Sequence, residues 1–166
     1  MYYSGNENNL YKTIQSLPDA VAIMRGNRKN NRLDGTVKFY QAINGVFVIA
    51  DIRGLPYSLK KCGNNIYGFH IHSGTECTGN SDDLFANSGT HYNPLNCPHP
   101  YHAGDMPPLF GVSGHAILAF LTDRFTLNEV IGKAVIIHDK PDDFTTQPSG
   151  NSGNKIACGI ISRVSR

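Results

Sequence analysis

The chain has 166 residues and a net charge of +2, from 15 basic and 13 acidic side chains. This length fits one domain with a sizeable core. So small a net charge gives no signal for binding nucleic acid or an anionic membrane, and no apolar run reaches the ~18 residues that a transmembrane helix needs.

The first 19 residues are mostly polar, and we expect them to form an N-terminal arm before a domain over residues 20–166. They contain no basic start followed by an apolar stretch, so we predict no signal peptide. We therefore expect a cytoplasmic protein. An extracellular or periplasmic location is the alternative, if a leader has been removed.

Short apolar or alternating segments begin at residue 20, and turn residues separate them. In chain order they cover residues 20–24, 35–40, 45–52, 66–72, 115–122, 133–138 and 156–161. The first three recur at intervals of roughly ten residues, which is typical of strands in an all-β sandwich or barrel. Two long segments, 73–110 and 139–155, interrupt the pattern, and loops of this length inside a domain are usually functional.

Six of the seven histidines lie in these two loops or at their edges. Side chains alternate faces along a strand, so His70 and His72 should share one face while Phe69 and Ile71 turn to the core. His138, at the end of a later apolar segment, could add a third imidazole from a neighbouring strand. Two exposed strand histidines without a ligand are the alternative interpretation.

The first long loop carries a denser group: His91, His99, His102 and Asp105. Three imidazoles and a carboxylate suit a closed tetrahedral zinc site that organises the loop. A solvated loop that holds these residues by chance is the alternative. All six imidazoles and the carboxylate are too many for one tetrahedral ion but enough for two, one of which could do redox chemistry. The seventh histidine, His115, has no ligand partner nearby in sequence, and we expect a structural role.

Five segments resemble motifs of the Cu/Zn superoxide dismutase family, including its bacterial members. They are Gly68-Phe69-His70-Ile71-His72, His91-Tyr92-Asn93-Pro94, His102-Ala103-Gly104-Asp105, His138-Asp139-Lys140-Pro141-Asp142-Asp143, and the stretch from Gly150 to Gly159. The resemblance extends over nearly all of residues 20–162. It implies an eight-stranded Greek-key β-barrel with two long functional loops, and an enzyme that disproportionates superoxide anion to oxygen and hydrogen peroxide with copper and zinc.

The resemblance also implies a role for each motif residue. Copper would be held by His70, His72, His91 and His138. Zinc would be held by His91, His99, His102 and Asp105, so that His91 bridges the two ions. Asp142 would accept hydrogen bonds from one histidine of each site and fix their orientation. Cys77 and Cys158 would form the intrasubunit disulfide of the family.

Some positions depart from the family pattern. Lys155 stands where the family has an arginine that guides the anion, and lysine keeps the charge without the planar fork of donors. Cys97 lies in the loop over residues 73–110, among the residues that would hold zinc. Cys62 precedes the strand that carries His70 and His72. Two alternatives stay open for these cysteines. A thiolate near zinc could compete as a ligand, or the two cysteines could form a second disulfide.

Other functional classes remain as alternatives to the enzyme. One is a dismutase-like structural domain that binds zinc but not copper, although no copper histidine of the family is missing here. Another is a copper-delivery module, although the chain has neither Cys-x-x-Cys nor Cys-x-Cys. The sequence does not distinguish a homodimer from a monomer.

Overall fold

The computed structural model describes residues 15–165. Most of the expected N-terminal arm, residues 1–14, therefore lies outside the described residues. The first strand begins at Ala20, where the apolar pattern begins. The strands are β1 (Ala20–Gly26), β2 (Asp34–Ala42), β3 (Gly45–Arg53), β4 (Ile66–Tyr67), β5 (Phe69–His72), β6 (Leu109–Phe110), β7 (Ala116–Thr122), β8 (Ala134–His138) and β9 (Lys155–Arg163). Two short helices, η1 (Ala86–Ser88) and α2 (Leu127–Val130), complete the described elements.

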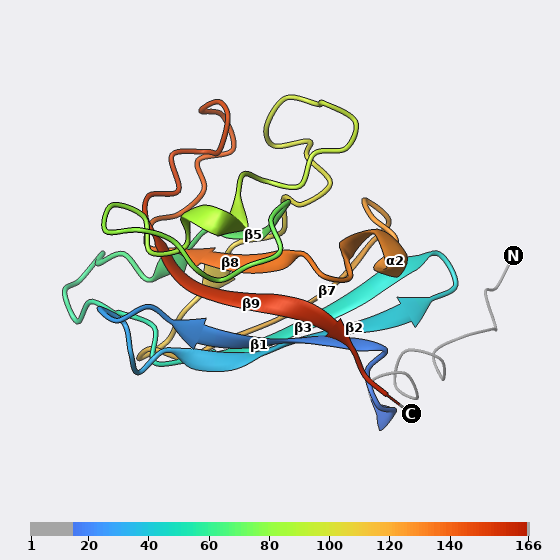
Figure 1. Ribbon diagram of the computed structural model, residues 1–166. Helices are drawn as coiled ribbons and strands as arrows, with labels where there is room; N and C mark the ends of the chain where they lie inside the picture. The colour runs from blue at the N-terminus through green and yellow to red at the C-terminus, as the bar shows by residue number, and fades with distance from the viewer. Residues whose placement is uncertain (1–14, 166) are drawn as a thin grey trace, which may run out of the picture.

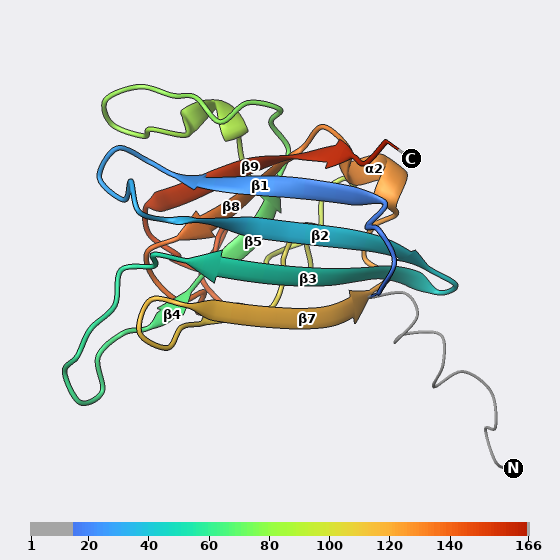
Figure 2. The same cartoon turned by 90° about the horizontal axis from the view of Figure 1, so that it is seen from below.

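Seven strands form one antiparallel sheet in the order β5-β8-β9-β1-β2-β3-β7, and β4 pairs with β6 in a second, two-stranded sheet. Figure 2 shows β9, β1, β2, β3 and β7 side by side. The large sheet curls, so that its β5–β8 end stands over β1 to β3 (Figure 1). The predicted all-β fold is confirmed.

The core lies inside this curl and follows from the alternation of each strand. On β2 and β3, Val37, Phe39 and Val48 are fully buried, and Phe39 pairs directly with Val48. From the opposite end of the sheet, Phe69 and Ile71 of β5 join the same apolar cluster. The predicted core face of β5 is therefore confirmed.

Most strand boundaries shift by one or two residues from the sequence prediction, and two differences are larger. The single strand expected over residues 66–72 is divided at Gly68, because the Gly68 backbone bonds to Lys140 O and to His138 N, at 2.7 and 2.8 Å, instead of continuing the ladder. The loop expected over residues 73–110 ends earlier, because Leu109 and Phe110 form β6 against β4. If β4 and β5 are counted as one interrupted strand, the described part of the chain has eight strands.

The two long loops lie over the outer face of β5 and β8, at the top of Figure 1. Strands β5 and β8 are consequently buried on both faces along their whole length. Burial on both faces rules out the alternative of exposed histidines, since His70 is 0% and His72 2% exposed. No helix among residues 15–165 is long and apolar enough to cross a membrane.

Candidate metal centre

Four histidines converge where β5, β8 and the first long loop meet. His70 and His72 point to the outer face of β5, His138 ends the adjacent strand β8, and His91 forms an isolated bridge with His72. Their nearest ring nitrogens all lie within 4.8 Å of one another, and all four residues are buried. Strand alternation thus brings together the two imidazoles that the sequence placed on one face, the neighbouring strand adds the third, and the loop adds a fourth.

A second group lies beside the first, within the loop between β5 and β6. It contains His91, His99, His102 and Asp105, whose potential ligand atoms again lie within 4.8 Å of one another. His91 belongs to both groups. Its Nδ1 lies 2.7 Å from Asp105 Oδ1, while its Nε2 is buried and has no hydrogen-bond partner. One imidazole therefore joins two sets of potential ligands.

Backbone hydrogen bonds fix this loop against β5. Ile71 N donates to Gly104 O at 2.9 Å, Gly104 N donates to Tyr92 O at 2.8 Å, and Tyr92 N donates to Ile71 O at 2.8 Å. A Cβ on Gly104 would clash with the Ile71 carbonyl, so only glycine allows this close approach. The three bonds hold the segments of His91 and Asp105 beside His70 and His72.

Arg124 also holds the loop between β5 and β6. Its Nη1 donates to Pro100 O at 2.8 Å, with longer contacts of 3.4 Å to His102 O and Asp105 O. Sequence reasoning missed Arg124, because its side chain meets only backbone carbonyls, which leave no pattern in the sequence.

Asp142 lies between the two groups, as its predicted role requires. Its Oδ2 lies 2.7 Å from His70 Nε2 and its Oδ1 2.9 Å from His99 Nε2. Gly150, with φ 65°, packs against this junction, and a Cβ there would clash with both the Asp142 carboxylate and His99 Nε2. The second long loop thus supplies one carboxylate that orients a ring in each group.

Backbone carbonyls orient two further rings. Gly89 O lies 2.9 Å from His72 Nδ1, and Gly153 O lies 3.3 Å from His138 Nδ1. A carbonyl can only accept, so the proton of each neutral ring must reside on Nδ1, and each Nε2 keeps its lone pair. The two Nε2 atoms then face each other at 3.4 Å, an arrangement that a bound cation would stabilise.

The ring nitrogens on the inside of the site lack partners. Four are buried without a hydrogen bond among the described residues: His70 Nδ1, His91 Nε2, His99 Nδ1 and His102 Nδ1. His99 Nδ1 lies 3.0 Å and His102 Nδ1 3.4 Å from Asp105 Oδ2, but neither contact has hydrogen-bond geometry. Unsatisfied buried polar atoms are rare and costly. Imidazole nitrogens with free lone pairs are the donors that copper and zinc prefer, so these residues fit two metal ions.

The protonation of the site suits metal binding. Burial, strengthened by the neighbouring histidines, lowers the pKa of His138 to about 3, and burial lowers the pKa of His70 to about 4. Burial also lowers the pKa of His72 and of His102. For Asp142, burial alone would raise the pKa, but hydrogen bonds from His70, Phe144 N and His99 outweigh it and lower the pKa to about 2. At neutral pH these imidazoles are neutral and the carboxylate is ionised.

Lys155 begins β9 and lines a hollow of about 400 Å³ together with His72, His91 and His138. Its side chain is 13% exposed, and its ammonium forms an ion pair of 2.8 Å with Asp83. The structure thus places Lys155 beside the first group of histidines. Sequence reasoning missed Asp83, because 72 positions separate it from Lys155 and its polar loop contains several similar residues.

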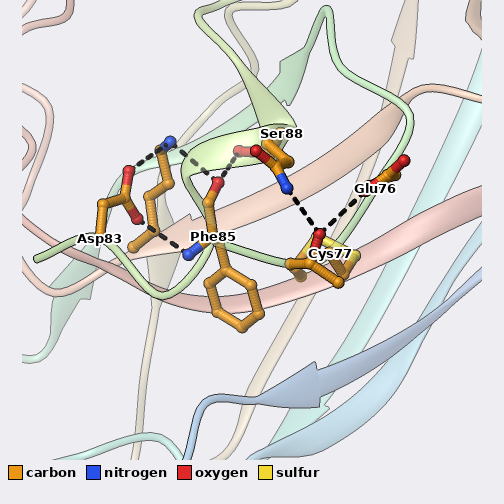
Figure 3. Close-up of a disulfide and its surroundings, with 9 residues drawn as sticks. Glu76, Cys77, Asp83, Phe85 and Ser88 are labelled. Atoms are coloured by element: carbon orange, nitrogen blue, oxygen red, sulfur yellow. Dashed lines mark hydrogen bonds and ion pairs between the residues drawn. A yellow bond between two sulfur atoms is a disulfide. The ribbon is translucent and has the colours of Figure 1, made fainter. Parts of the chain in front are cut away.

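The four cysteines divide into one pair and two free thiols. Cys77 and Cys158 form a disulfide that joins the first long loop to β9 (Figure 3), which confirms the expected pairing. Cys62 and Cys97 are both free, so the second disulfide is not formed. Cys97 is also outside both ligand groups. His115 lies outside them too, with Nε2 2.8 Å from Asp51 Oδ1.

The fold and the two ligand groups agree with a comparison to known families. Residues 33–161 match the family described as copper/zinc superoxide dismutase (SODC). The chain belongs to this family. The predicted resemblance is therefore confirmed.

Similar proteins with established names include bacterial and plant enzymes. The chain is 34% identical to the Cu-Zn superoxide dismutase of Legionella pneumophila over 135 residues, which cover 76% of each chain. It is 31% identical to Cu-Zn superoxide dismutase 2 of Aquifex aeolicus over 142 residues, which cover 76% of this chain and 78% of the relative. It is also 31% identical to Cu-Zn superoxide dismutase 3 of Arabidopsis thaliana, over 86% of this chain and 88% of the relative. Family membership makes the chain an oxidoreductase with copper and zinc as cofactors and superoxide as substrate.

Proposed function

We propose that each residue of the two groups has the role that its position in the family motifs implies. His70, His72, His91 and His138 would hold copper, and His91, His99, His102 and Asp105 would hold zinc. The observation that carries this proposal is the set of inward-facing ring nitrogens without partners, grouped into two sets that share His91. A purely structural cluster would pair those nitrogens with hydrogen-bond donors or acceptors.

When bound, copper supplies the redox chemistry, because it can take an electron from one superoxide and give it to a second. Formation of hydrogen peroxide consumes two protons, both taken from solvent, and the chain relays one of them and sets the geometry. His91 Nε2 faces the first group without a partner, so we propose this atom as the one that takes up and returns a proton during turnover. Asp142 holds the rings of His70 and His99, and the two glycine carbonyls hold those of His72 and His138, so that each of these rings keeps one nitrogen free to hold an ion.

The second group would hold the loop and fix His91. Asp105 contacts His91 Nδ1 at 2.7 Å and accepts from His102 N at 3.1 Å, so the carboxylate already connects two ligand segments. A zinc ion held by a closed set of four ligands contributes directly to folding free energy. We propose this stabilising role for the zinc group, and residues 20–166 as the dismutase domain around it.

Metal analysis of reconstituted protein tests these roles. We expect one copper and one zinc per chain, with the visible absorption band of copper(II). His138→Gln, which removes a ligand of the copper group alone, should lose that band and keep zinc. Saturation of the parent at one ion, without a visible band, would instead indicate the zinc-binding structural domain.

The cellular compartment of the protein and its oligomeric state stay predictions. The N-terminus led us to expect the cytoplasm, whereas the disulfide is typical of an oxidising compartment and favours the extracellular or periplasmic alternative. Fractionation of the source cells would decide between them. Analytical ultracentrifugation of metal-loaded protein would distinguish the homodimer from the monomer.

A further inference from the structure

The ammonium group of Lys155 has all its hydrogen-bond donors engaged within the protein. Nζ donates to Asp83 Oδ2 at 2.8 Å, to Phe85 O at 3.2 Å and to Gly89 O at 3.3 Å. A lysine ammonium has three N–H donors and an arginine guanidinium has five. The arginine of the family could make the same contacts and keep donors for an anion, but Lys155 in this arrangement cannot.

The three acceptors belong to one segment of the first long loop. Figure 3 shows Asp83 and Phe85 on the loop that leaves Cys77, whose disulfide partner Cys158 lies three positions beyond Lys155 in β9. The second carboxylate oxygen of Asp83 accepts from Phe85 N at 2.9 Å, which fixes the orientation of the carboxylate. The ion pair is therefore built into the loop and does not depend on a freely rotating surface side chain.

The ion pair between Lys155 and Asp83 determines the net charge beside the hollow. Among the described residues that line the hollow with His72, His91 and His138, Lys155 is the only lysine or arginine, and the Asp83 carboxylate compensates its charge at 2.8 Å. We infer that Asp83 is a positioning residue that sets the anion affinity of the metal site by engaging Lys155. Given the proposed function, the anion concerned is superoxide.

The substitution Asp83→Asn tests this inference with little change in shape. The amide oxygen can still accept from Phe85 N, while the charge beside Lys155 is removed. We expect azide, used as an anionic probe, to bind the copper- and zinc-loaded variant about three- to tenfold more tightly, since removing one unit charge a few ångströms from a partly exposed cation has an effect of this order. The gain should shrink as salt rises, because salt screens the uncompensated charge of Lys155.

Asp82→Asn is the matched control. Asp82 lies on the same loop and gives the same change in net charge, but its hydrogen bonds go to Ser81 and Asn80. We expect less than a twofold change in azide affinity. Equal gains in the two variants would overturn the inference, because net charge alone would then explain both. Adding Lys155→Met to Asp83→Asn should abolish the gain, and a gain that persists in the double variant would also overturn it.

A readout on metal-free protein separates this inference from the proposed function. The rate at which an acylating reagent modifies the Lys155 amine, followed by mass spectrometry, should rise in Asp83→Asn and not in Asp82→Asn. This test needs neither copper nor turnover. Unchanged acylation would overturn the inference even if the loaded enzyme is active. Faster acylation in a protein that does not dismutate superoxide would support the engagement of Lys155 while the proposed function fails.

Discussion

Opening the disulfide between Cys77 and Cys158 should cost the protein much of its stability. The bond closes a loop of 81 positions, and in the chain-entropy model a loop of that size corresponds to about 4 to 5 kcal/mol. For a domain of this length, such a loss should lower the melting temperature by roughly 10 to 15 °C. Cys158 is also buried in a small cluster with Phe85, Ala134 and Ile136, so reduction releases the packed loop as well.

The cleanest comparison uses one chain in two redox states. In a Cys62→Ser, Cys97→Ser background only the disulfide can change, and metal-free protein avoids the coupling of metal binding to folding. Urea unfolding with and without a strong reductant gives the two free energies of unfolding. The background itself should unfold like the oxidised parent, since neither replaced thiol belongs to the core. A difference below ~1 kcal/mol between the two redox states would refute the loop-closure reasoning.

Three further predictions concern the metal centre. Metal-free protein should lose stability as pH falls below 6.5, because the unfolded chain then protonates histidines that burial keeps neutral in the fold, where the pKa is about 4 for His70 and about 3 for His138. The slope should approach 1.4 kcal/mol per pH unit for each of the two, and flat stability from pH 7 to 5 would contradict it. Asp142→Asn offers one acceptor where His70 and His99 need two. Competition with a chelator should show about 10- to 100-fold weaker metal affinity, and unchanged affinity would contradict the orienting role. Arg124→Ala removes donors to the zinc loop, so zinc should transfer to a chelator several-fold faster than from the parent. Equal transfer rates would show that the loop does not need this contact.

The strands that carry the site could be predicted because they are regular. Alternation along β5 placed Phe69 and Ile71 in the core and the two histidines opposite, and the structure confirms that division, with the first pair in the apolar cluster and the histidines in the ligand group. The same reasoning could not show that those histidines are buried. Their cover comes from loops whose path depends on contacts such as Ile71 N to Gly104 O, and single backbone contacts of this kind leave no periodic trace in the sequence.

The partners of the site residues were predictable only where a family motif includes them. Asp142 was expected to join the two groups because it belongs to the His138 segment. Asp83 was not, because an ion pair between side chains 72 positions apart depends on how a loop is tied down by the disulfide. The glycine carbonyls that fix two ring tautomers could not be predicted either, because every residue type supplies a backbone carbonyl.

Catalytic removal of superoxide is measured most directly by pulse radiolysis of protein loaded with copper and zinc. At a protein concentration far below that of superoxide, we expect first-order decay with a rate proportional to the protein concentration and many turnovers per chain. Zinc-only protein and His138→Gln should leave the decay at its uncatalysed rate. A parent protein that holds one copper and one zinc per chain, yet leaves superoxide decay unchanged, would contradict the assignment of this site as a dismutase.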